Sequence, residues 1–526
     1  MAQLQFKGKS FVQNHHLVVP YHELIPRKDK SLTDKVSLHD NLILHGDNLL
    51  ALKALLPMYA GKVKCVYIDP PYNTGNEGWV YNDAVNSPEI RRWLGQVVGP
   101  EAQDLSRHDK WLCMMYPRLA LLREFLSEDG AIFVTIDDTE IAGLLLLTSE
   151  IFGERNHLCT VIWQHSVQPK GYSGNFSIHH NYLVAYRRSE RFILKDVARR
   201  EEHNLHYANP DDDPKGPWRA GDVRNALFRP NLIYDLVTPS GKVIKPPSKG
   251  WRWSRQTMAD KIASGEIVFR DEERRIVRKI YLKDQQGRPP ESIWFGEDVG
   301  TTREANQELK VLFDGQVPFE TPKPVKLIRR VLEVATDGDC LVLDSFAGSG
   351  TTAQAVLEQN NDDKGNRRFI LVELDPEVCE KVTYERVSRV VKGRGEYYSQ
   401  GGGFRYCTLG ESLFDEAGSI RKTVTFSELA AHVFFTETGA PVPQPVDTLS
   451  PLLGTHGGKA VYLLFNGVLG DRRPAGGNVL TGDVLQHLPA FDGARVVYGE
   501  GCRLGADRLR QEGVVFRQIP YEIKVS

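Results

Sequence analysis

The apolar residues of this chain alternate between strand-like and helix-like spacing. From Asn41, the stretch NLILHGDNLLALKALLPMYAGKVKCVYIDPPY predicts a strand, a Gly-Asp turn, a helix and a second strand that ends at Asp69. In DKWLCMMYPRLALLREFLSEDG, apolar residues recur every three or four positions, which predicts a helix, and the strand AIFVTID then closes on Asp137 and Asp138. These segments predict an α/β arrangement in which strands end in carboxylates.

The same alternation returns in the second half of the chain. The stretch PKPVKLIRRVLEVATDGDCLVLDSFAGSGTTAQAVLEQN predicts a helix, a strand, a glycine turn and a helix, and RRFILVELD predicts a further strand. Between the two halves, the chain is rich in aromatic residues, Pro and Gly, and its apolar alternation is irregular. The two halves are therefore predicted to build one sheet that an inserted module interrupts.

This pattern divides the chain into five predicted regions. They are an N-terminal arm (1–40), the first half of the sheet (41–162), the insert (163–310), the second half (311–408) and a C-terminal α/β domain (409–526). In the last region, KAVYLLFNG, LTGDVLQHLPAF, ARVVYG, GADRLRQEG and VVFRQIPYEI alternate, which predicts a small parallel sheet. At 526 residues the chain is too long for one ordinary core, so several domains are expected.

Charge distinguishes the insert from the rest. The whole chain carries 66 Lys and Arg against 68 Asp and Glu, a net charge of −2. Residues 163–310 hold 26 Lys and Arg against 20 Asp and Glu, a local excess of six positive charges, so the remaining residues together carry −8. The insert is therefore the basic part of a chain whose overall charge favours no particular partner.

Composition also bears on metals and location. The seven cysteines are scattered singly, with no CxxC pair and no Cys/His cluster at metal-ligand spacing, so no metal site is predicted. The longest apolar runs are far shorter than the roughly 20 residues that a bilayer span requires. The first residues lack the pattern of a secretory signal. We therefore expect a cytoplasmic protein without a membrane segment.

The turn in LVLDSFAGSGTT has the features of a nucleoside site. Asp344 ends a buried-strand run, and Gly348 and Gly350 precede a helix that starts at Thr351. Glycines allow positive φ and close approach of a ligand, while a helix N-terminus favours an anionic group. About twenty residues onward, Glu373 ends the next strand, a spacing that suits a carboxylate binding ribose hydroxyls. Alone, the turn is also compatible with a tight strand-helix connection whose glycines serve packing.

Three cofactor classes compete for this turn. No GK[ST] sequence follows the glycines, which excludes a phosphate loop for ATP. A dinucleotide fingerprint needs a third glycine at the position of Ala353. S-adenosyl-L-methionine fits best, because it has no pyrophosphate to cradle but has a charged methionine end to hold.

The tetrad Asp69-Pro70-Pro71-Tyr72 suits methyl transfer to the exocyclic amine of a nucleobase. Such an amine is a poor nucleophile because its lone pair is delocalised into the ring, so transfer needs acceptors for both amine hydrogens. Asp69 can accept one, and the Pro70 carbonyl, fixed by the restricted proline backbone, can accept the other. Tyr72 can stack on the base and offset the few kcal/mol that flipping costs. Positioning and electrostatics would then provide the catalysis.

Together, DPPYNTG and the later FAGSGTT resemble the motifs of beta-class amino-methylating DNA methyltransferases, in which the catalytic motif precedes the cofactor motif. The segments GDNLLAL, WLCMMYPRL, IFVTIDD, RPNL, WRWS and KPVKLI extend this resemblance to the modification (Mod) subunit of type III restriction-modification systems, over roughly residues 40 to 400. The resemblance implies a Rossmann-like methyltransferase sheet with S-adenosyl-L-methionine as cofactor and an inserted target-recognition domain.

The resemblance also assigns roles to single positions. The catalytic loop comprises Asp69, Pro70, Pro71 and Tyr72, and the methionine-side pocket and ribose position comprise Asp344, Phe346, Gly348, Gly350 and Glu373. Asp47 is similar to the residue that meets the adenine edge of the cofactor, with an Asx-type turn as the alternative. Lys323, with Pro324, matches a Lys-Pro motif near the cofactor carboxylate, with an exposed helix start as the alternative. Asp137 and Asp138 belong to an IDD segment and have a capping or loop role as the alternative.

Sequence recognition has to come from outside the catalytic loop, because that loop holds whichever base is flipped. The insert supplies Arg and Lys for phosphates and guanine edges, and aromatic and amide side chains for bases. The candidates are Arg219, Arg229, Lys249, Arg252 and Arg255, with the aromatics Trp251 and Trp253. For any single residue the alternative is that the tryptophans, Trp294 included, are core residues and the arginines form a solvated face.

These observations predict a site-specific methyltransferase that acts on adenine N6 of a flipped base in double-stranded DNA. The Asp-containing tetrad favours adenine. Cytosine N4 is one alternative, and an inactive DNA-recognition subunit that docks a nuclease is another. The C-terminal region, which simpler family members often lack, favours assembly with a partner or a second copy, so a homodimer is expected, with a stabilising appendage as the alternative. Because no GK[ST] phosphate loop is present, cleavage is expected to need a separate restriction (helicase-nuclease) subunit.

Overall fold

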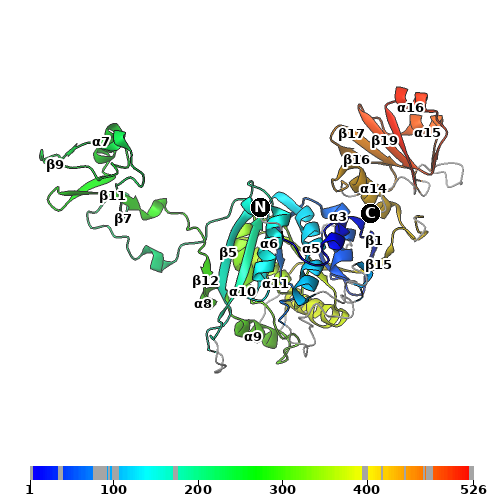
Figure 1. The fold of residues 1–526 in the computed structure, drawn as a ribbon, viewed down its shortest axis with the longest axis horizontal. Coiled ribbons are helices and arrows are strands. Elements are labelled where there is room, and N and C mark those ends of the chain that lie inside the picture. Colours follow the sequence, from blue (N-terminus) through cyan, green and yellow to red (C-terminus); the bar gives the residue numbers. More distant parts are fainter. Residues whose placement is uncertain are drawn as a thin grey trace. The chain divides into compact units, whose positions relative to one another are not determined.

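A computed structural model gives the fold of most of the chain (Figure 1). The described residues are 4–33, 40–74, 92, 95–97, 106–169, 176–393, 401–415, 419–443, 446–465, 468 and 478–519. The chain splits into two compact units. One consists of Met1–Leu194 with Glu291–Ser526, and the other is Lys195–Pro290.

A ten-stranded sheet forms the centre of the first unit, in the order β1-β15-β2-β14-β13-β3-β4-β6-β5-β12. In that order the bounds are His22–Pro26, Phe404–Ser412, Asn41–His45, Arg368–Glu373, Leu341–Asp344, Val63–Ile68, Leu126–Ile136, His180–Arg187, His157–Gln164 and Ile293–Trp294. The six strands from β15 to β4 run parallel, whereas β6 is antiparallel to both of its neighbours. Strands from both halves of the chain alternate in one sheet, so the predicted α/β fold with an interruption is confirmed.

Two groups of helices cover this sheet (Figure 1). The first comprises α3 (Asn48–Tyr59), α5 (Arg107–Phe125) and α6 (Ile141–Phe152), and the second comprises α10 (Val325–Ala335), α11 (Thr351–Asp363) and α13 (Tyr384–Lys392). The helix α5 begins with a capping box, in which Ser106 Oγ accepts a hydrogen bond from Asp109 N (3.1 Å) and Asp109 accepts one from Ser106 N (3.1 Å). Its apolar face, including Trp111 and Phe125, is buried in the main core with residues of β3 and β4.

The N-terminal arm contributes to the edge of the sheet. It forms the short helices α1 (Lys9–Val12) and α2 (His15–Val18), followed by β1, which pairs antiparallel with β15. Residues 1–40 show no sustained apolar periodicity, so the sequence did not predict this strand. Because β15 ends at Ser412, the sheet also extends past the predicted boundary at residue 408.

The separate unit is shorter than the predicted insert of 163–310. The hairpin β5–β6, which holds Trp163, and strand β12 pair within the large sheet, and the helices α8 (Gly296–Val299) and α9 (Thr302–Leu312) belong to the same unit. Only Lys195–Pro290 forms a compact unit of its own. Its flanks in the sequence therefore belong to the large sheet and to the helices of the first unit.

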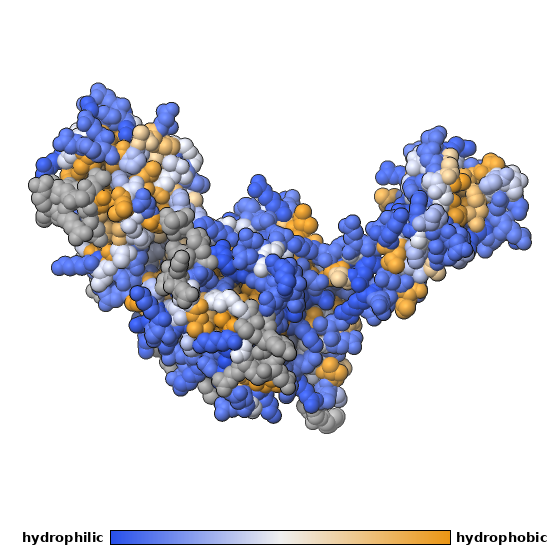
Figure 2. All heavy atoms as spheres, turned by 180° about the vertical axis from the view of Figure 1, so that it is seen from behind, coloured by the Kyte–Doolittle hydropathy of each residue, from blue (hydrophilic) through white to orange (hydrophobic). Residues whose placement is uncertain are grey.

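The unit Lys195–Pro290 is built on a three-stranded antiparallel sheet in the order β10-β11-β7. Its elements are β7 (Trp218–Gly221), β8 (Leu236–Val237), β9 (Val243–Ile244), α7 (Arg255–Ala263), β10 (Ile267–Arg270) and β11 (Arg275–Tyr281). A small core includes Trp251, Met258 and Ile276. The face of this unit seen in Figure 2, at the right, is mostly hydrophilic.

The C-terminal region is a small α/β domain. Its sheet has the order β16-β17-β19-β21, with β17, β19 and β21 parallel and β16 antiparallel to β17. The bounds are α14 (Phe426–Thr438), β16 (Leu452–His456), β17 (Lys459–Leu463), β18 (Val479–Leu480), α15 (Gly482–His487), β19 (Ala494–Gly499), β20 (Gly501–Cys502), α16 (Ala506–Gln511) and β21 (Val514–Gln518). The predicted parallel sheet is confirmed, whereas α14 and β16 were not predicted.

Within the described part of the chain, no helix combines the length and apolar character needed to cross a membrane.

Candidate active site

The loops that carry the two motifs, the Asp69–Tyr72 tetrad and the glycine turn, both start at the carboxyl ends of central strands of the sheet. Strands β13 and β3 are adjacent and parallel, with Leu343 paired to Val66, so the loops that follow them start side by side. From β13 the chain continues to β14 on one side, and from β3 it continues to β4 on the other. This is a topological switch point, where open α/β sheets bind ligands at the carboxyl ends of their strands.

Asp344 is the fixed point of the loop after β13. Its side chain is buried, and its two oxygens accept hydrogen bonds from Phe346 N (3.0 Å) and Thr352 Oγ1 (2.5 Å). Burial raises the pKa of Asp344 to about 7, although these two hydrogen bonds favour the ionised form. The nearby carboxylates of Asp69 and Glu373 raise this pKa further.

The glycines of this loop have the backbone that the sequence predicts. Gly348 and Gly350 have φ angles of 50° and 77°. A Cβ at position 348 would lie 3.0 Å from Cζ of Phe319, and one at position 350 would lie 3.3 Å from Cγ2 of Thr383. Side chains at these positions would crowd Phe319 and Thr383 and would strain a backbone of positive φ, so the turn favours glycine.

Glu373 lies against the same turn. Its carboxylate accepts hydrogen bonds from Gly348 N (2.7 Å) and from Asp375 N (3.0 Å). From the other side, Thr383 Oγ1 donates to the Gly348 carbonyl (2.6 Å). Arg386, which is fully buried, donates to Ser349 Oγ (3.0 Å) in the turn itself. Glu373, Phe346 and both glycines thus lie together with Asp344.

Asp69 stands at the end of β3, between two partners. Its Oδ1 accepts a hydrogen bond from Thr135 Oγ1 (2.6 Å) on β4, and its Oδ2 contacts the ammonium of Lys323. The Lys323 side chain is 10% exposed and that of Asp69 is 23% exposed. Lys323 is therefore not the exposed helix-start residue of the alternative interpretation, and its partner within the chain is Asp69.

Tyr72 lies beside this ion pair. The Lys323 Nζ is 5.1 Å from the centroid of the Tyr72 ring, within the range of a cation–π contact. The ring packs against the main core. Burial, with the Asp69 carboxylate as second cause, raises the pKa of Tyr72 well above its usual value. The phenol is therefore a neutral ring next to the acidic group.

The two prolines differ in their carbonyl contacts. The indole of Trp111, on α5, donates a hydrogen bond to the Pro71 carbonyl (2.7 Å). In the part of the chain that the structure describes, no donor reaches the Pro70 carbonyl. Pro70 thus keeps an available acceptor at the end of β3, next to the Asp69 carboxylate.

Asn73 follows the tetrad and anchors the loop to the core of the unit. It is fully buried in a left-handed conformation, with φ of 61°. Its amide donates to Glu140 Oε1 and to the Arg107 carbonyl (3.2 Å). The same Glu140 oxygen also contacts His108 Nδ1 (2.8 Å), and burial raises the pKa of Glu140. No role was predicted for Asn73 from the sequence. Its position directly after the prolines could have indicated a left-handed residue, since Asn tolerates that backbone.

Asp47 has a local role at the start of α3, as its alternative interpretation predicted. As N-cap of α3, its Oδ1 accepts hydrogen bonds from Leu49 N (2.9 Å) and Leu50 N (3.0 Å). The adjacent Asn48 donates to the Ser345 carbonyl (3.2 Å), which ties this helix start to the turn after β13. Capping and proximity to the turn are both present at Asp47.

Asp137 and Asp138 end β4 at the same edge of the sheet. Asp137 Oδ1 accepts a hydrogen bond from Thr139 N (2.8 Å), which is the local turn role. Asp138 Oδ1 accepts one from the hydroxyl of Tyr182 (2.8 Å) on β6. Both aspartates therefore act within the chain as turn and strand contacts.

The candidate DNA contacts of the 195–290 unit lie on its surface, several of them beside aromatic rings. Arg219 donates to the Tyr207 hydroxyl (3.1 Å), Lys249 donates to the Ala226 carbonyl (3.0 Å), and Arg229 is exposed. The guanidinium of Arg255 lies 4.9 Å from the centre of the Tyr234 ring and that of Arg252 5.8 Å from the centre of the Trp253 ring.

The tryptophans among the candidates are mainly structural. Trp251 and Trp294 are buried, as the alternative interpretation holds, and Trp253 is half-buried against the core of the unit. Beyond Arg252, the Trp253 ring also has Lys261 and Arg278 near its face, at 5.4 and 5.8 Å from its centre.

No group of three His, Cys, Asp or Glu side chains suited to a metal ion occurs among the described residues.

Known protein families show which family this chain belongs to. Residues 63–385, from the start of β3 into α13, match the family described as DNA methylase. The chain belongs to the DNA methylase family. The methylase is also 30% identical over 498 residues to the Mod subunit of the type III restriction-modification enzyme StyLTI of Salmonella typhimurium, a match that covers 87% of this chain and 74% of that subunit. The resemblance inferred from the motifs is confirmed.

A second relative and a solved structure extend the comparison. The methylase is 31% identical over 426 residues to the EcoP15I Mod subunit of Escherichia coli, which covers 72% of this chain and 65% of the relative. Among solved structures, the PvuII DNA methyltransferase (cytosine-N4-specific) is 12% identical, with a TM-score of 0.34 over 68% of this chain and 94% of that one. The methylase thus spans about two thirds to three quarters of the length of the two Mod subunits.

Proposed function

We propose that this methylase transfers a methyl group from S-adenosyl-L-methionine to adenine N6 at a specific sequence in double-stranded DNA, as the modification subunit of a restriction-modification system. The observation that carries the proposal is the start of the Asp69 loop and of the glycine turn on adjacent parallel strands. Transfer between two bound molecules needs two sites within contact of each other. An amine site after β3 and a cofactor site after β13 meet that requirement.

The glycine turn and Glu373 would hold the cofactor. Gly348 and Gly350 offer backbone without Cβ atoms, and the buried Asp344 fixes the start of the turn. Glu373, already in contact with this turn, is the acceptor for ribose hydroxyls. When bound, S-adenosyl-L-methionine supplies a methyl group made electrophilic by its positively charged sulfur.

Asp69 and Pro70 would bind the two hydrogens of the target amine. Thr135 and Lys323 hold the Asp69 carboxylate from two sides, so its orientation is set before a base arrives. The carbonyl of Pro71 is engaged by Trp111, which leaves that of Pro70 as the tetrad carbonyl for the amine. Two oriented acceptors favour the pyramidal nitrogen that attack on a methyl group requires.

Tyr72 would form a wall of the base pocket. A flipped base has lost its stacking neighbours, and an aromatic side chain replaces part of that contact. The raised pKa of Tyr72 keeps its hydroxyl protonated, so the ring stacks as a neutral group. Lys323, close to the same ring, would hold both Asp69 and Tyr72 in place.

The 195–290 unit would recognise the DNA sequence. It contains 20 Lys and Arg against 14 Asp and Glu, so the entire positive excess of the predicted insert lies in it. Cations beside aromatic rings, as at Trp253 and Tyr234, suit contacts with phosphates and bases. The methylase would act in the cytoplasm, as a homodimer, with a restriction subunit as partner.

Nucleoside mass spectrometry tests the reaction. DNA from cells that express the chain alone is digested and compared with DNA from cells that express the Asp69→Ala variant. We expect 6-methyladenine only with the unsubstituted chain, and sequencing of the same DNA should place it in one motif. The appearance of 4-methylcytosine instead would assign the cytosine alternative, and the absence of both would support a subunit that only recognises DNA.

A further inference from the structure

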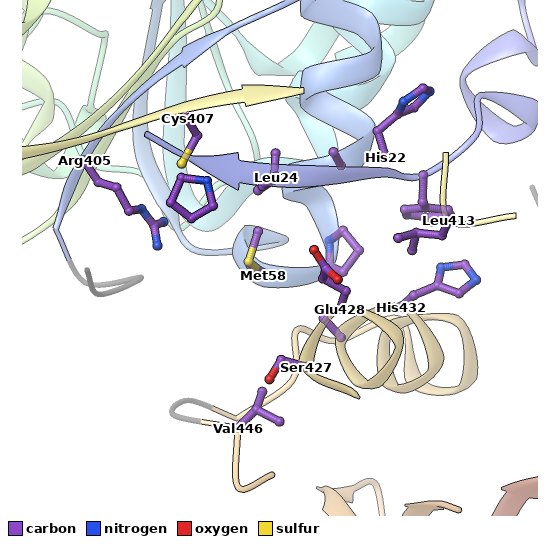
Figure 3. Close-up of a pocket in the computed structure, with 15 residues that line it drawn as sticks. His22, Leu24, Met58, Arg405, Cys407, Leu413, Ser427, Glu428, His432 and Val446 are labelled. Atoms are coloured by element: carbon purple, nitrogen blue, oxygen red, sulfur yellow. The ribbon is translucent and has the colours of Figure 1, made fainter. Parts of the chain in front are cut away.

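A cavity of about 220 Å³ lies in the first unit, away from the active site (Figure 3). Its walls come from the sheet edge β1–β15, from the end of α3 and from α14 with the residues after it. Most of the lining is apolar, including Leu24, Met58, Ala431 and Val446. The volume equals that of roughly seven water molecules at ~30 Å³ each, enough for a small organic molecule.

One wall carries an arginine that forms no ion pair with any residue that the structure describes. Arg405, on β15, is 5% exposed and extends toward the side of the cavity where α14 lies (Figure 3). Across the described residues its guanidinium donates no hydrogen bond and forms no ion pair, and its Nε is buried without a partner. A guanidinium withdrawn from water is destabilising unless an anion compensates it.

A second arginine shows how this protein normally treats such a group. Arg367, at the start of β14, is also 5% exposed. Its guanidinium donates to Thr336 Oγ1 (2.8 Å) and forms a two-point pair with Asp363, at 2.9 and 2.8 Å. The two arginines are equally buried, but only Arg367 has an anionic partner among the described residues. The cavity beside Arg405 is therefore the place where an anion could bind.

Two other polar groups of the cavity, Glu428 and His22, have hydrogen-bond partners of their own. Glu428 accepts hydrogen bonds from Thr425 N (2.8 Å) and Thr425 Oγ1 (2.7 Å) in the capping box of α14. His22 Nδ1 contacts the Gly410 carbonyl (3.0 Å). Among the described residues, Glu428 forms no ion pair with Arg405.

We propose that this cavity is a binding site for a small aliphatic carboxylate. The carboxylate would accept a two-point, charge-assisted interaction from Arg405, and the aliphatic part would lie against Leu24, Met58 and Val446. The occupant would touch β15 on one side and α14 on the other, so binding links the sheet to the first helix of the C-terminal domain.

Hexanoate, with eight non-hydrogen atoms, is the probe for this site. We expect saturable binding to the full-length protein in calorimetric titration, and hexanamide, which lacks the charge, should bind at least about tenfold more weakly. Arg405→Met removes the charge at similar volume and should weaken hexanoate binding about tenfold to a hundredfold. Hydrogen exchange of α14 should slow when hexanoate is bound to the unsubstituted protein.

Melting temperatures without added ligand provide the control. Arg405→Met should melt no lower than the unsubstituted protein, because an uncompensated buried charge is removed, whereas Arg367→Met should melt clearly lower. Methyl transfer by Arg405→Met should stay within about twofold of the unsubstituted chain, since Arg405 lies outside the active site. Equal binding of hexanoate to both proteins, equal binding of hexanamide, or a melting loss in Arg405→Met like that in Arg367→Met would each overturn the proposal.

Discussion

The two loops of the candidate active site leave adjacent strands, but they are held by different means. The turn after β13 depends mainly on residues nearer in the chain: Asp344 binds Phe346 and Thr352, and Glu373 comes from the next strand. One distant residue, Asn48, adds a contact with the Ser345 carbonyl. The loop after β3 depends on distant elements. Thr135 lies 66 residues from Asp69, and Lys323 lies 254 residues from it.

This difference separates two ways of building a site. The backbone of the β13 turn follows mainly from its own glycines and from the contacts of Asp344, so its geometry is largely set by the local sequence. A loop of prolines has a restricted backbone but no means of orienting its carboxylate, so its geometry depends on tertiary packing. We therefore expect substitutions in the β13 turn to act mainly on folding and cofactor binding, and those around the β3 loop to act mainly on turnover.

Asp69→Ala should give the largest effect. Loss of the oriented acceptor is expected to lower kcat by about 10³-fold, on the order of 4 kcal/mol, with DNA affinity nearly unchanged. Single-turnover methylation and gel-shift binding measure the two quantities. Undiminished turnover would mean that another group binds the amine.

Asp344→Asn should change stability in a pH-dependent way. The pKa of Asp344 is raised from 3.8 to about 7 in the folded protein, so between pH 4 and 7 the folded state holds a proton that the unfolded state has lost. The free energy of unfolding must therefore fall as pH rises through this window, by at most about 4 kcal/mol. The variant lacks this titration and should be more stable at pH 8 by roughly 2–4 kcal/mol while binding cofactor poorly.

Urea unfolding at pH 4.5 and pH 8 checks this prediction. The Thr352 hydroxyl can rotate to accept from the new amide, so the polar contact of Asp344 is kept in the variant. Equal pH slopes for both proteins would show that Asp344 ionises normally and that burial is not the dominant influence.

Asn73→Ala should be the most damaging change among the anchors of the β3 loop. It leaves the buried Glu140 with one partner fewer, at about 2 kcal/mol, and it replaces Asn by a residue that tolerates the φ of 61° less well, at about 1 kcal/mol more. Asn73→Gly loses the same amide but relieves the backbone, so it should be about 1 kcal/mol more stable than Asn73→Ala. Identical urea midpoints for the two variants would show that the loop relaxes out of the left-handed conformation.

Local geometry in this protein could be predicted from the sequence, whereas contacts between distant segments could not. The strand-end acids, the glycine turn and the cap at Asp47 follow from residues within a few positions of each other. The contacts of Asp69 with Lys323, of Pro71 with Trp111 and of Asn73 with Glu140 join segments that no periodicity relates. For the same reason, β6 was assigned to the insert, because it pairs with β4, which lies far outside the predicted module.

Lys323→Met distinguishes two roles for one lysine. The resemblance places Lys323 near the cofactor carboxylate, whereas the structure has its ammonium on Asp69. If the contact with Asp69 is functional, kcat should fall about tenfold, on the order of 1.4 kcal/mol, with little change in KM for S-adenosyl-L-methionine. Lys323→Arg keeps a cation and should recover part of this loss. A rise in KM at constant kcat would instead support the cofactor role.

Thr135→Val should give the smallest effect, and it tests the comparison of the two loops most directly. The substitution keeps the shape of the buried side chain but removes the hydroxyl that donates to Asp69 Oδ1 (2.6 Å). Because Lys323 still holds the other oxygen, kcat should fall only about fivefold, near 1 kcal/mol. Thr135→Ser is the matched control, since it keeps the hydroxyl and loses a methyl group, so it should lower the melting temperature without lowering kcat. If Thr135→Val and Thr135→Ser reduce turnover equally, packing of β4 and not the hydrogen bond orients Asp69. The β3 loop would then be supported like the core of the sheet, through shape, and not through polar contacts from distant segments.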